Sequence, residues 1–87
     1  METTINAPVD YSTMSIDSIA RVIRRNWTKV YFGAVPYLAA MAQMNSVSDN
    51  YGYDTGSSVV LYFLANANTW KGPVAREVKK ELKRRCK

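Results

Sequence analysis

The stretch from Gly72 to Cys86, GPVAREVKKELKRRC, decides the fold class of this chain. Its proline directly follows a glycine, and a helix tolerates proline at its first position because the N–H there would be unpaired anyway. Its apolar residues recur at helical spacing and, at 100° per residue, fall within a sector of about 120°. They are Val74, Ala75, Val78, Leu82 and Cys86. The stretch therefore predicts an amphipathic helix that begins at Pro73.

The opposite sector of this predicted helix is basic, and two interpretations of it are open. Proteins that bind nucleic acid present such a stripe of Lys and Arg to the phosphates. A small protein also needs a charged, solvated helix face for its solubility. Glu77, Glu81 and Arg85 form an i, i+4 ladder along the boundary of the two sectors. The candidate nucleic-acid-binding residues are Arg76, Lys79, Lys80, Lys83, Arg84 and Lys87.

Two helices are predicted upstream. Residues 15–27 carry apolar side chains at i, i+3, i+4, i+7 spacing, with Ser15 as the N-cap and Trp27 at the end of the stripe. Residues 34–45 contain Pro36 in a first turn, followed by an Ala- and Met-rich run of high helix propensity. This second helix is apolar nearly all round, so we expect it to be the most buried.

Residues 57–68 are ambiguous, because the run Val59–Phe63 also has strand propensity. A lone strand would have no partner, since every other apolar segment predicts a helix. We therefore expect a helix capped by Thr55 or Ser57. The predicted fold is all-α: a small four-helix single domain over residues 15–87, after a flexible N-terminal arm over residues 1–14. Within its core we expect Trp27 and Trp70 to be buried.

Length and composition exclude several functional classes. The chain has 87 residues, enough for one domain, with 47% hydrophobic and 22% charged residues and a net charge of +5. It contains no His, which excludes Ser-His-Asp triads and zinc sites that use His. Its single cysteine, Cys86, excludes an intrachain disulfide, and its basic surroundings predict a somewhat acidic thiol. We expect neither a cofactor nor enzymatic activity.

Residues 45–56, NSVSDNYGYDTG, predict a loop. Turn formation explains Asp49 and Asp54 without catalysis, and tyrosines stand where an EF-hand needs oxygen ligands. We expect the two glycines of this loop, at positions 52 and 56, to supply positive-φ turn positions. We expect this polar loop to expose at least one of its two tyrosines, a residue type that offers contact area at little entropic cost. The candidate protein-binding residues are Tyr51, Tyr53 and Asp54.

Four stretches between the first and last predicted helices carry a resemblance: WTKVYFGAVPYL at 27–38, YGYDTG at 51–56, YFLANA at 62–67 and TWKG at 69–72. Together they resemble a pattern in small uncharacterised proteins of phages and integrative elements. The resemblance implies a mobile-element origin and supplies no catalytic residues. Small phage proteins of this size often bind a host or phage macromolecule, and inhibitors of host defence are among them.

We therefore expect a non-enzymatic binding protein of phage or mobile-element origin. The first hypothesis is a protein–protein interaction module that binds a host or phage protein, an inhibitor of a host or defence factor among the options, through the Tyr51–Gly56 loop and adjacent helix ends. The alternative is a nucleic-acid-associated protein that uses its basic C-terminal helix. The first 14 residues lack the pattern of an export signal, and Gly33 and Pro36 interrupt the longest apolar stretch. We expect the host cytoplasm and no membrane partner.

Overall fold

Four α-helices form the fold over residues 10–52 and 54–87, the part of the chain that the computed structural model describes. They are α1 (Ile16–Asn26), α2 (Val35–Met41), α3 (Gly56–Ala65) and α4 (Pro73–Arg85). Short 3-10 turns, η2 (Tyr11–Thr13) and η3 (Phe32–Ala34), precede α1 and α2. The strands β1 (Asn50–Tyr51) and β2 (Asp54–Thr55) form an antiparallel hairpin before α3. The all-α prediction is confirmed.

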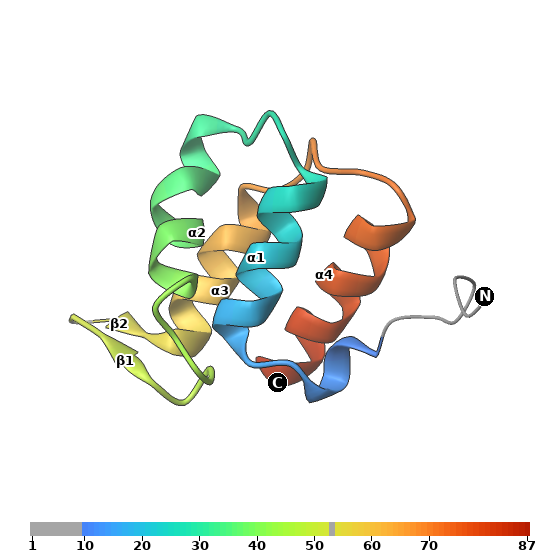
Figure 1. Ribbon diagram of the computed structural model, residues 1–87. Helices are drawn as coiled ribbons and strands as arrows, with labels where there is room; N and C mark the ends of the chain where they lie inside the picture. The colour runs from blue at the N-terminus through green and yellow to red at the C-terminus, as the bar shows by residue number, and fades with distance from the viewer. Residues whose placement is uncertain (1–9, 53) are drawn as a thin grey trace.

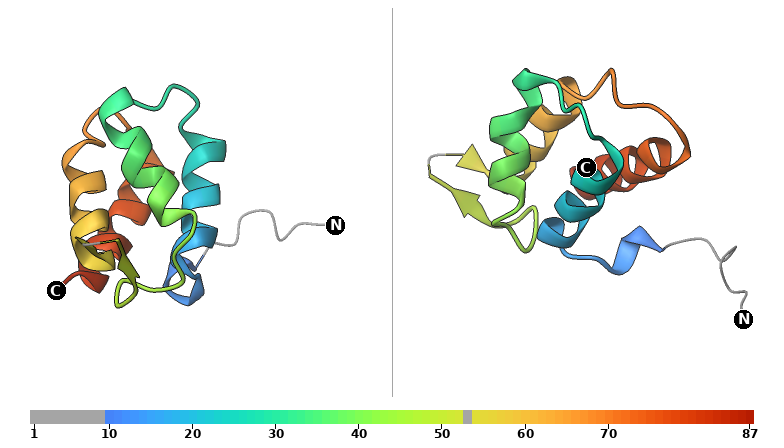
Figure 2. Two further views of the ribbon diagram at one scale, coloured as in Figure 1. Left: turned by 90° about the vertical axis from the view of Figure 1, so that its left-hand side faces the viewer. Right: turned by 45° about the horizontal axis from the view of Figure 1, so that its top comes forward.

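The helices pack in a ring around one core. Helix α2 lies between α1 and α3, and α4 packs against α1 and α3 on the other side (Figures 1 and 2). The largest fully buried side chains in the core come from all four helices. They are Ile16, Ile19, Ile23, Met41, Val60, Phe63, Val78 and Leu82. The apolar stripes predicted for α1 and α4 therefore face the interior.

The predicted caps explain where α3 and α4 begin. The Thr55 hydroxyl oxygen accepts a hydrogen bond from the backbone N–H of Ser58 at 3.1 Å, so α3 starts as an N-capped helix and the strand alternative is excluded. Pro73 occupies the first turn of α4, after Gly72 at φ +113°. A positive φ of this size favours glycine, which explains the Gly-Pro pair.

Helix α1 begins after Ser15, as predicted, but its first N–H groups are satisfied by a distant segment. The Ser15 hydroxyl donates to the side chains of Asp17 and Ser18 instead of capping the backbone. The backbone N–H groups of Ile16 and Asp17 donate to the carbonyls of Asn45 and Met44 at 3.0 and 2.8 Å. The chain that follows α2 therefore caps α1.

Helix α2 is shorter than the predicted 34–45. It ends at Met41 because Gln43 and Met44 bond three positions back, with the N–H of Met44 donating to the Met41 carbonyl at 3.1 Å. This turn carries the chain toward α1. Helix α2 buries three of its seven residues, Leu38, Ala40 and Met41, a share at least as large as that of any other helix, in agreement with the expected burial. It is not buried on all sides, however, because Val35 is 47% exposed.

The segment predicted as a loop contains the β hairpin, in which Asn50 pairs with Thr55 and Tyr51 with Asp54. Gly52 has φ +64°, as expected for a turn. Gly56 differs from expectation: it is the buried first residue of α3 and has no positive φ. A Cβ there would lie 2.7 Å from the Val47 carbonyl oxygen, so glycine allows this loop to approach the helix.

The predicted N-terminal arm is described in part. Residues 1–9 lie outside the described residues. In residues 10–14, η2 packs against α4, and Tyr11 and Met14 contact the core. Within the described part of the chain, no helix has both the length and the apolar character needed to cross a bilayer.

Candidate functional site

The predicted protein-binding residues lie on the hairpin. Asp54 is exposed and its backbone pairs with that of Tyr51, whereas Tyr53 lies outside the described residues. Asp49 has the structural role that the turn pattern predicts, because its carboxylate accepts hydrogen bonds from the N–H groups of Asn45 and Ser46 at 2.9 and 3.1 Å. The hairpin leads directly into α3 and so borders the outer surface of that helix (Figure 1).

Some side chains of the basic stripe of α4 form hydrogen bonds within the protein. Lys79 is half-buried; its Nζ donates to the Trp70 carbonyl at 2.6 Å and lies 5.9 Å from the Trp70 ring centroid. Burial lowers the pKa of Lys79, and the nearby Lys71 and Lys83 add to this shift. Two of the six candidate cations, Lys79 and Arg84, therefore have protein partners. The other four are exposed: Arg76, Lys80, Lys83 and Lys87.

The second candidate cation with a protein partner, Arg84, is bound by Glu81. Glu81 accepts two hydrogen bonds from Arg84, at 2.9 and 2.6 Å, and one from Arg85 at 2.6 Å. The hydrogen bonds from Arg84 lower the pKa of Glu81 to about 2; partial burial opposes this shift and the bond from Arg85 adds to it. Arg85 also donates to the Tyr11 carbonyl at 2.7 Å. The predicted ladder at this boundary thus ties the N-terminal turn to α4.

Cys86 does not have the acidic thiol expected from its basic neighbours. Its side chain is partly buried against the core and lies 3.8 Å from the Ser57 carbonyl oxygen. Burial raises the pKa of Cys86, although the hydrogen bond to Ser57 opposes the shift. Desolvation of the thiolate outweighs the positive charges along the helix.

Five large apolar side chains on α2, on α3 and in the turn before α2 are exposed to solvent. Phe32 is 79% exposed, and the other four are between 43% and 49% exposed. We use the name α2–α3 face for these residues: Tyr31, Phe32, Val35, Leu61 and Tyr62. By contrast, Trp27 and Trp70 are buried, as predicted, and Phe63 is buried with them.

Aromatic contacts connect the two helices of this face. The rings of Tyr37 on α2 and Tyr62 on α3 lie with centroids 5.4 Å apart. At the start of α2, the rings of Tyr31 and Phe32 are 4.8 Å apart. Helices α2 and α3 run side by side in both views of Figure 2. The face is therefore a joint product of two adjacent helices, which explains why neither segment alone predicts it.

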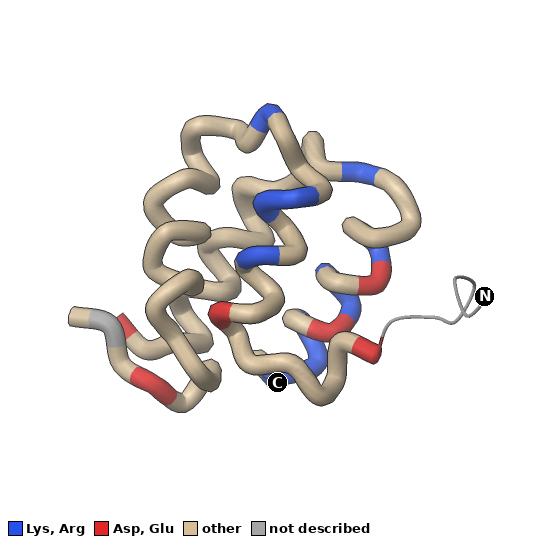
Figure 3. The backbone as a smooth tube through the Cα atoms, in the orientation of Figure 1, with Lys and Arg blue, Asp and Glu red and all other residues tan. Residues whose placement is uncertain are grey.

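The α2–α3 face is also free of charge. No Asp, Glu, Lys or Arg stands between Lys29 and Asp49, nor between Asp54 and Lys71. Figure 3 shows the consequence: basic residues follow α1, α4 and the loops beside them, while α2 and α3 carry none. This lack of charge over two consecutive stretches is the signal in the sequence that could have located the face.

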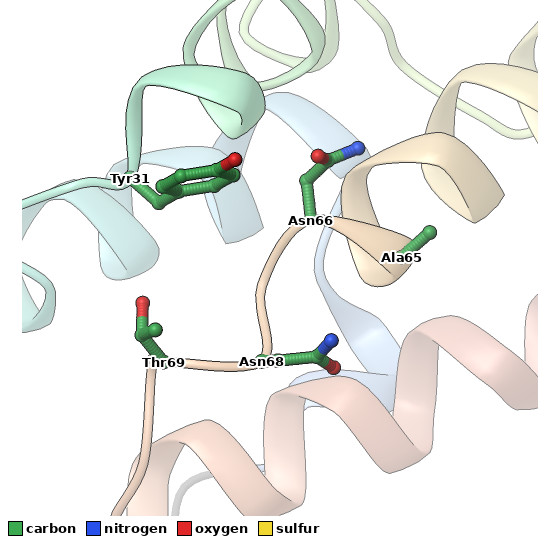
Figure 4. Close-up of a pocket in the computed structure, with 5 residues that line it drawn as sticks. All are labelled: Tyr31, Ala65, Asn66, Asn68 and Thr69. Carbon is green, nitrogen blue, oxygen red and sulfur yellow. The ribbon is translucent and has the colours of Figure 1, made fainter.

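A small pocket of about 270 Å³ lies at one end of the face, lined by Tyr31, Ala65, Asn66, Asn68 and Thr69 (Figure 4). The Tyr31 ring points toward Asn66, whose amide donates to the Tyr62 carbonyl at 2.9 Å. Gly33 permits this arrangement, because a Cβ there would lie 2.6 Å from the ring and 2.7 Å from the Asn66 Oδ1. The pocket is smaller than most cofactor sites and suits one side chain of a partner.

No protein-family model, no curated protein and no solved structure matches the chain. A proposal for the function therefore rests on the chemistry of the exposed surfaces. The uncharged aromatic surface of the α2–α3 face suits apolar contact, whereas the exposed cations of α4 suit a polyanion.

Proposed function

We propose that the protein is a non-enzymatic protein-binding module of phage or mobile-element origin, and that the α2–α3 face is its binding surface. The exposure of Phe32, at 79%, is the observation that carries this proposal. Exposed apolar patches on small proteins mark interaction sites, and aromatic residues dominate the energetics of protein interfaces. The resemblance to phage and integrative-element proteins supports the same function, and we place it in the host cytoplasm.

The pocket beside Tyr31 supports a protein partner further. Interface anchors are side chains that fill small, desolvated pockets, and a pocket of about 270 Å³ accepts one such side chain. The amides of Asn66 and Asn68 and the hydroxyl of Thr69 can hydrogen-bond the partner's backbone at its rim. The hairpin with Asp54 borders the face and extends the proposed surface.

A photo-crosslinking amino acid placed at position 32 tests the proposal, with the same group at position 76 on α4 as the matched control. We expect cross-links to protein from position 32 and few from position 76. A captured protein supports the proposal only if, once purified, it binds the wild-type chain and fails to bind Phe32→Ser. Cross-links that arise from position 76 alone would move the binding surface to α4.

Nucleic-acid binding is the second candidate function, because four cations on α4 or just after its end are exposed: Arg76, Lys80, Lys83 and Lys87. Lys80, Lys83 and Lys87, together with Arg84, line a hollow of about 360 Å³. Such a cluster attracts phosphates by releasing counterions. The bonds that hold Lys79 and Arg84 within the protein weaken this candidate, since they reduce the number of free cations.

A further inference from the structure

We infer that the protein partner presents an acidic segment, whose carboxylates bind in a basic hollow next to the pocket beside Tyr31. This inference rests on the proposed function and names the chemistry of its partner. The hollow has a volume of about 230 Å³ and lies around the start of α4. Its charged lining residues are Lys71, Arg76 and Lys79, and Asn68 and Trp70 also line it. We call it the Lys71 hollow.

The Lys71 hollow and the pocket beside Tyr31 adjoin each other. Asn68 lines both of them, and Thr69 of the pocket is followed directly by Trp70 and Lys71 of the hollow. Figure 4 shows Asn68 and Thr69 on the connection that leads from α3 toward α4. A peptide segment that places one side chain in the pocket therefore has its neighbouring side chains at the hollow.

The Lys71 hollow is positively charged, and the described residues that line it include no Asp or Glu. No ion pair within the described part of the chain involves Lys71, Arg76 or Lys79. Glu77 and Glu81, on the same helix, line a different hollow beside η2. Lys71 and Arg76 are exposed and can pair with a carboxylate. The net charge of +5 adds a long-range attraction for an acidic partner.

Lys79 supplies a positioned donor in the hollow. The bond from its Nζ to the Trp70 carbonyl, 2.6 Å long, holds the ammonium group in place. An ammonium group has three N–H donors, so this bond leaves donors for a carboxylate. Burial is the main cause of the lowered pKa of Lys79, and the charge of Lys71 adds to the shift, so the two cations lie near enough to repel each other. A bound carboxylate offsets this repulsion.

A single-stranded nucleic acid fits these two cavities less well. Proteins that bind single strands stack successive bases on aromatic side chains along a basic groove. Of the aromatic residues that line the two cavities, Tyr31 is 43% exposed, whereas Trp70 is 2% exposed and its ring is stacked on Trp27. Trp70 therefore cannot stack a base. One exposed ring beside the amides of Asn66 and Asn68 suits a single anchor side chain and the peptide backbone next to it.

Selection of peptides from a random library on the purified protein tests the inference. We expect the selected peptides to carry Asp and Glu next to an apolar side chain. Fluorescence anisotropy then compares the binding of one labelled selected peptide to two double variants of equal net charge. The variant Lys71→Ser/Arg76→Ser should raise the dissociation constant about fivefold to tenfold, because two exposed charge pairs are lost.

The matched control is Lys80→Ser/Lys83→Ser, whose positions line another hollow on α4. It should raise the dissociation constant about twofold or less, since it changes only the distant, screened charge. The same peptide with Asn and Gln in place of Asp and Glu should lose affinity for the wild type and be insensitive to Lys71→Ser/Arg76→Ser. Circular dichroism checks that each variant is folded.

The possible results separate this inference from the proposed function. Selected peptides without an excess of acidic residues that bind the wild type and not Phe32→Ser overturn the inference and leave the proposed function standing. Equal losses of affinity in the two double variants also overturn the inference, because binding then reflects net charge alone. A selection that yields no peptide overturns it as well, and cross-linking at position 32 then decides the proposed function separately.

A labelled single-stranded oligonucleotide, measured in the same way, tests the competing occupant. We expect it to bind more weakly than the selected peptide and to lose affinity equally in both double variants. An oligonucleotide that binds more tightly than the peptide, and loses affinity only in Lys71→Ser/Arg76→Ser, overturns the inference in favour of nucleic acid.

Discussion

Trp27 and Trp70 stack on each other, with ring centroids 5.8 Å apart and ring planes 12° apart. Trp27 directly follows α1, and Trp70 lies in the connection between α3 and α4. The edge of Phe63, on α3, meets Trp27 at 6.2 Å and 71°. The indole N–H of Trp70 donates to the Asn26 side chain at 2.9 Å. These aromatic contacts join the end of α1 to the segment that positions α4.

The first prediction concerns Trp27, which is 7% exposed. Replacement of Trp27 by Ala should lower the free energy of unfolding by about 3–5 kcal/mol, because it removes a large buried ring and the stacking on Trp70. Urea unfolding followed by circular dichroism measures the change. Phe32→Ala is the matched control: it also removes an aromatic ring, but from a site 79% exposed, and should change stability by about 0.5 kcal/mol or less. Equal losses of stability in the two variants would contradict the packing assignment.

The second prediction concerns the hydrogen bond between Asn26 and Trp70. Trp70 is 2% exposed, whereas Asn26 lies at the surface, so Asn26→Ala removes a part-buried hydrogen bond and admits water to the indole N–H. We expect the free energy of unfolding to fall by about 0.5–1.5 kcal/mol in the same urea experiment. Asn68→Ala, at an exposed asparagine, should cost less than about 0.5 kcal/mol. If both asparagine variants unfold at the wild-type urea concentration, the bond contributes nothing to stability.

The sequence predicts those helices that have one apolar side and one polar side, or a clear capping residue. The four-residue repeat from Val74 to Leu82 and the cap at Thr55 each identify a helix and its start. The end of α2 could not be predicted in this way. It depends on the turn to Met44 and on the bonds that this turn makes to the first residues of α1. The local sequence pattern around α2 does not show which distant residues bond to its end.

The exposed α2–α3 face escaped prediction for a related reason. Helices α2 and α3 are apolar over most of their surface, so the spacing of their residues gives no contrast between inside and outside. The exposed Tyr62 and the buried Phe63 are neighbours of similar character. Likewise, the position of Lys79 on the basic sector does not reveal its bond to the Trp70 carbonyl. Only the packing of neighbouring helices decides which side chains remain in solvent.

The third prediction concerns Gly56. An alanine Cβ would lie 2.7 and 2.9 Å from the carbonyl oxygens of Val47 and Asp49, and backbone atoms cannot move away as a side chain can. We expect Gly56→Ala to destabilise the protein by about 1–3 kcal/mol in thermal or urea unfolding. Gly52→Asn is the control, since its site is open and asparagine tolerates a positive φ. A Gly56→Ala protein as stable as Gly52→Asn would show that the loop does not press on α3.

The fourth prediction concerns the pH dependence of stability at Glu81. Its folded-state pKa of about 2 lies below the ordinary value of 4.5, so the unfolded chain binds this proton more readily. The stabilisation is therefore fully present above about pH 4.5 and is lost as the pH falls toward 2. At pH 7, Glu81→Gln should cost about 1–2 kcal/mol, allowing for solvent screening at the exposed Arg84.

Unfolding in urea at pH 7 and pH 2.5 measures this effect. The difference between the wild type and Glu81→Gln should shrink strongly at the lower pH. Asp17, whose pKa is lowered by the hydrogen bond from Ser15, is present in both proteins and cancels in the comparison. The pKa of Asp10 is lowered mainly by hydrogen bonds from Ser12, and the charge of Glu81 opposes this shift, so Glu81→Gln should lower the pKa of Asp10 slightly further. Glu77→Gln, one turn earlier on the exposed side, serves as the control. A Glu81→Gln deficit that is the same at both pH values would contradict the lowered pKa.

The fifth prediction separates the two candidate functions. Four cations of α4 are exposed and can be changed to Gln together without touching the core: Arg76, Lys80, Lys83 and Lys87. Lys79 is left unchanged, because its bond to the Trp70 carbonyl also stabilises the fold. For every cation that binds a phosphate, its removal should flatten the salt dependence of duplex DNA binding by about 0.9 log unit. Fluorescence anisotropy over a series of salt concentrations measures this slope.

The matched control removes four exposed cations from and beside α1, also by change to Gln: Arg21, Arg24, Arg25 and Lys29. If binding reflects net charge alone, both quadruple variants weaken it equally. DNA binding by the wild type should then be lost near physiological salt, where charges are screened beyond about 8 Å. This is the result we expect, because Lys79 and Arg84 are held by bonds within the protein, which leaves four of the six candidate cations for phosphate contacts. Binding that persists at that salt and disappears only in the α4 variant would make nucleic acid, and not a protein, the principal partner.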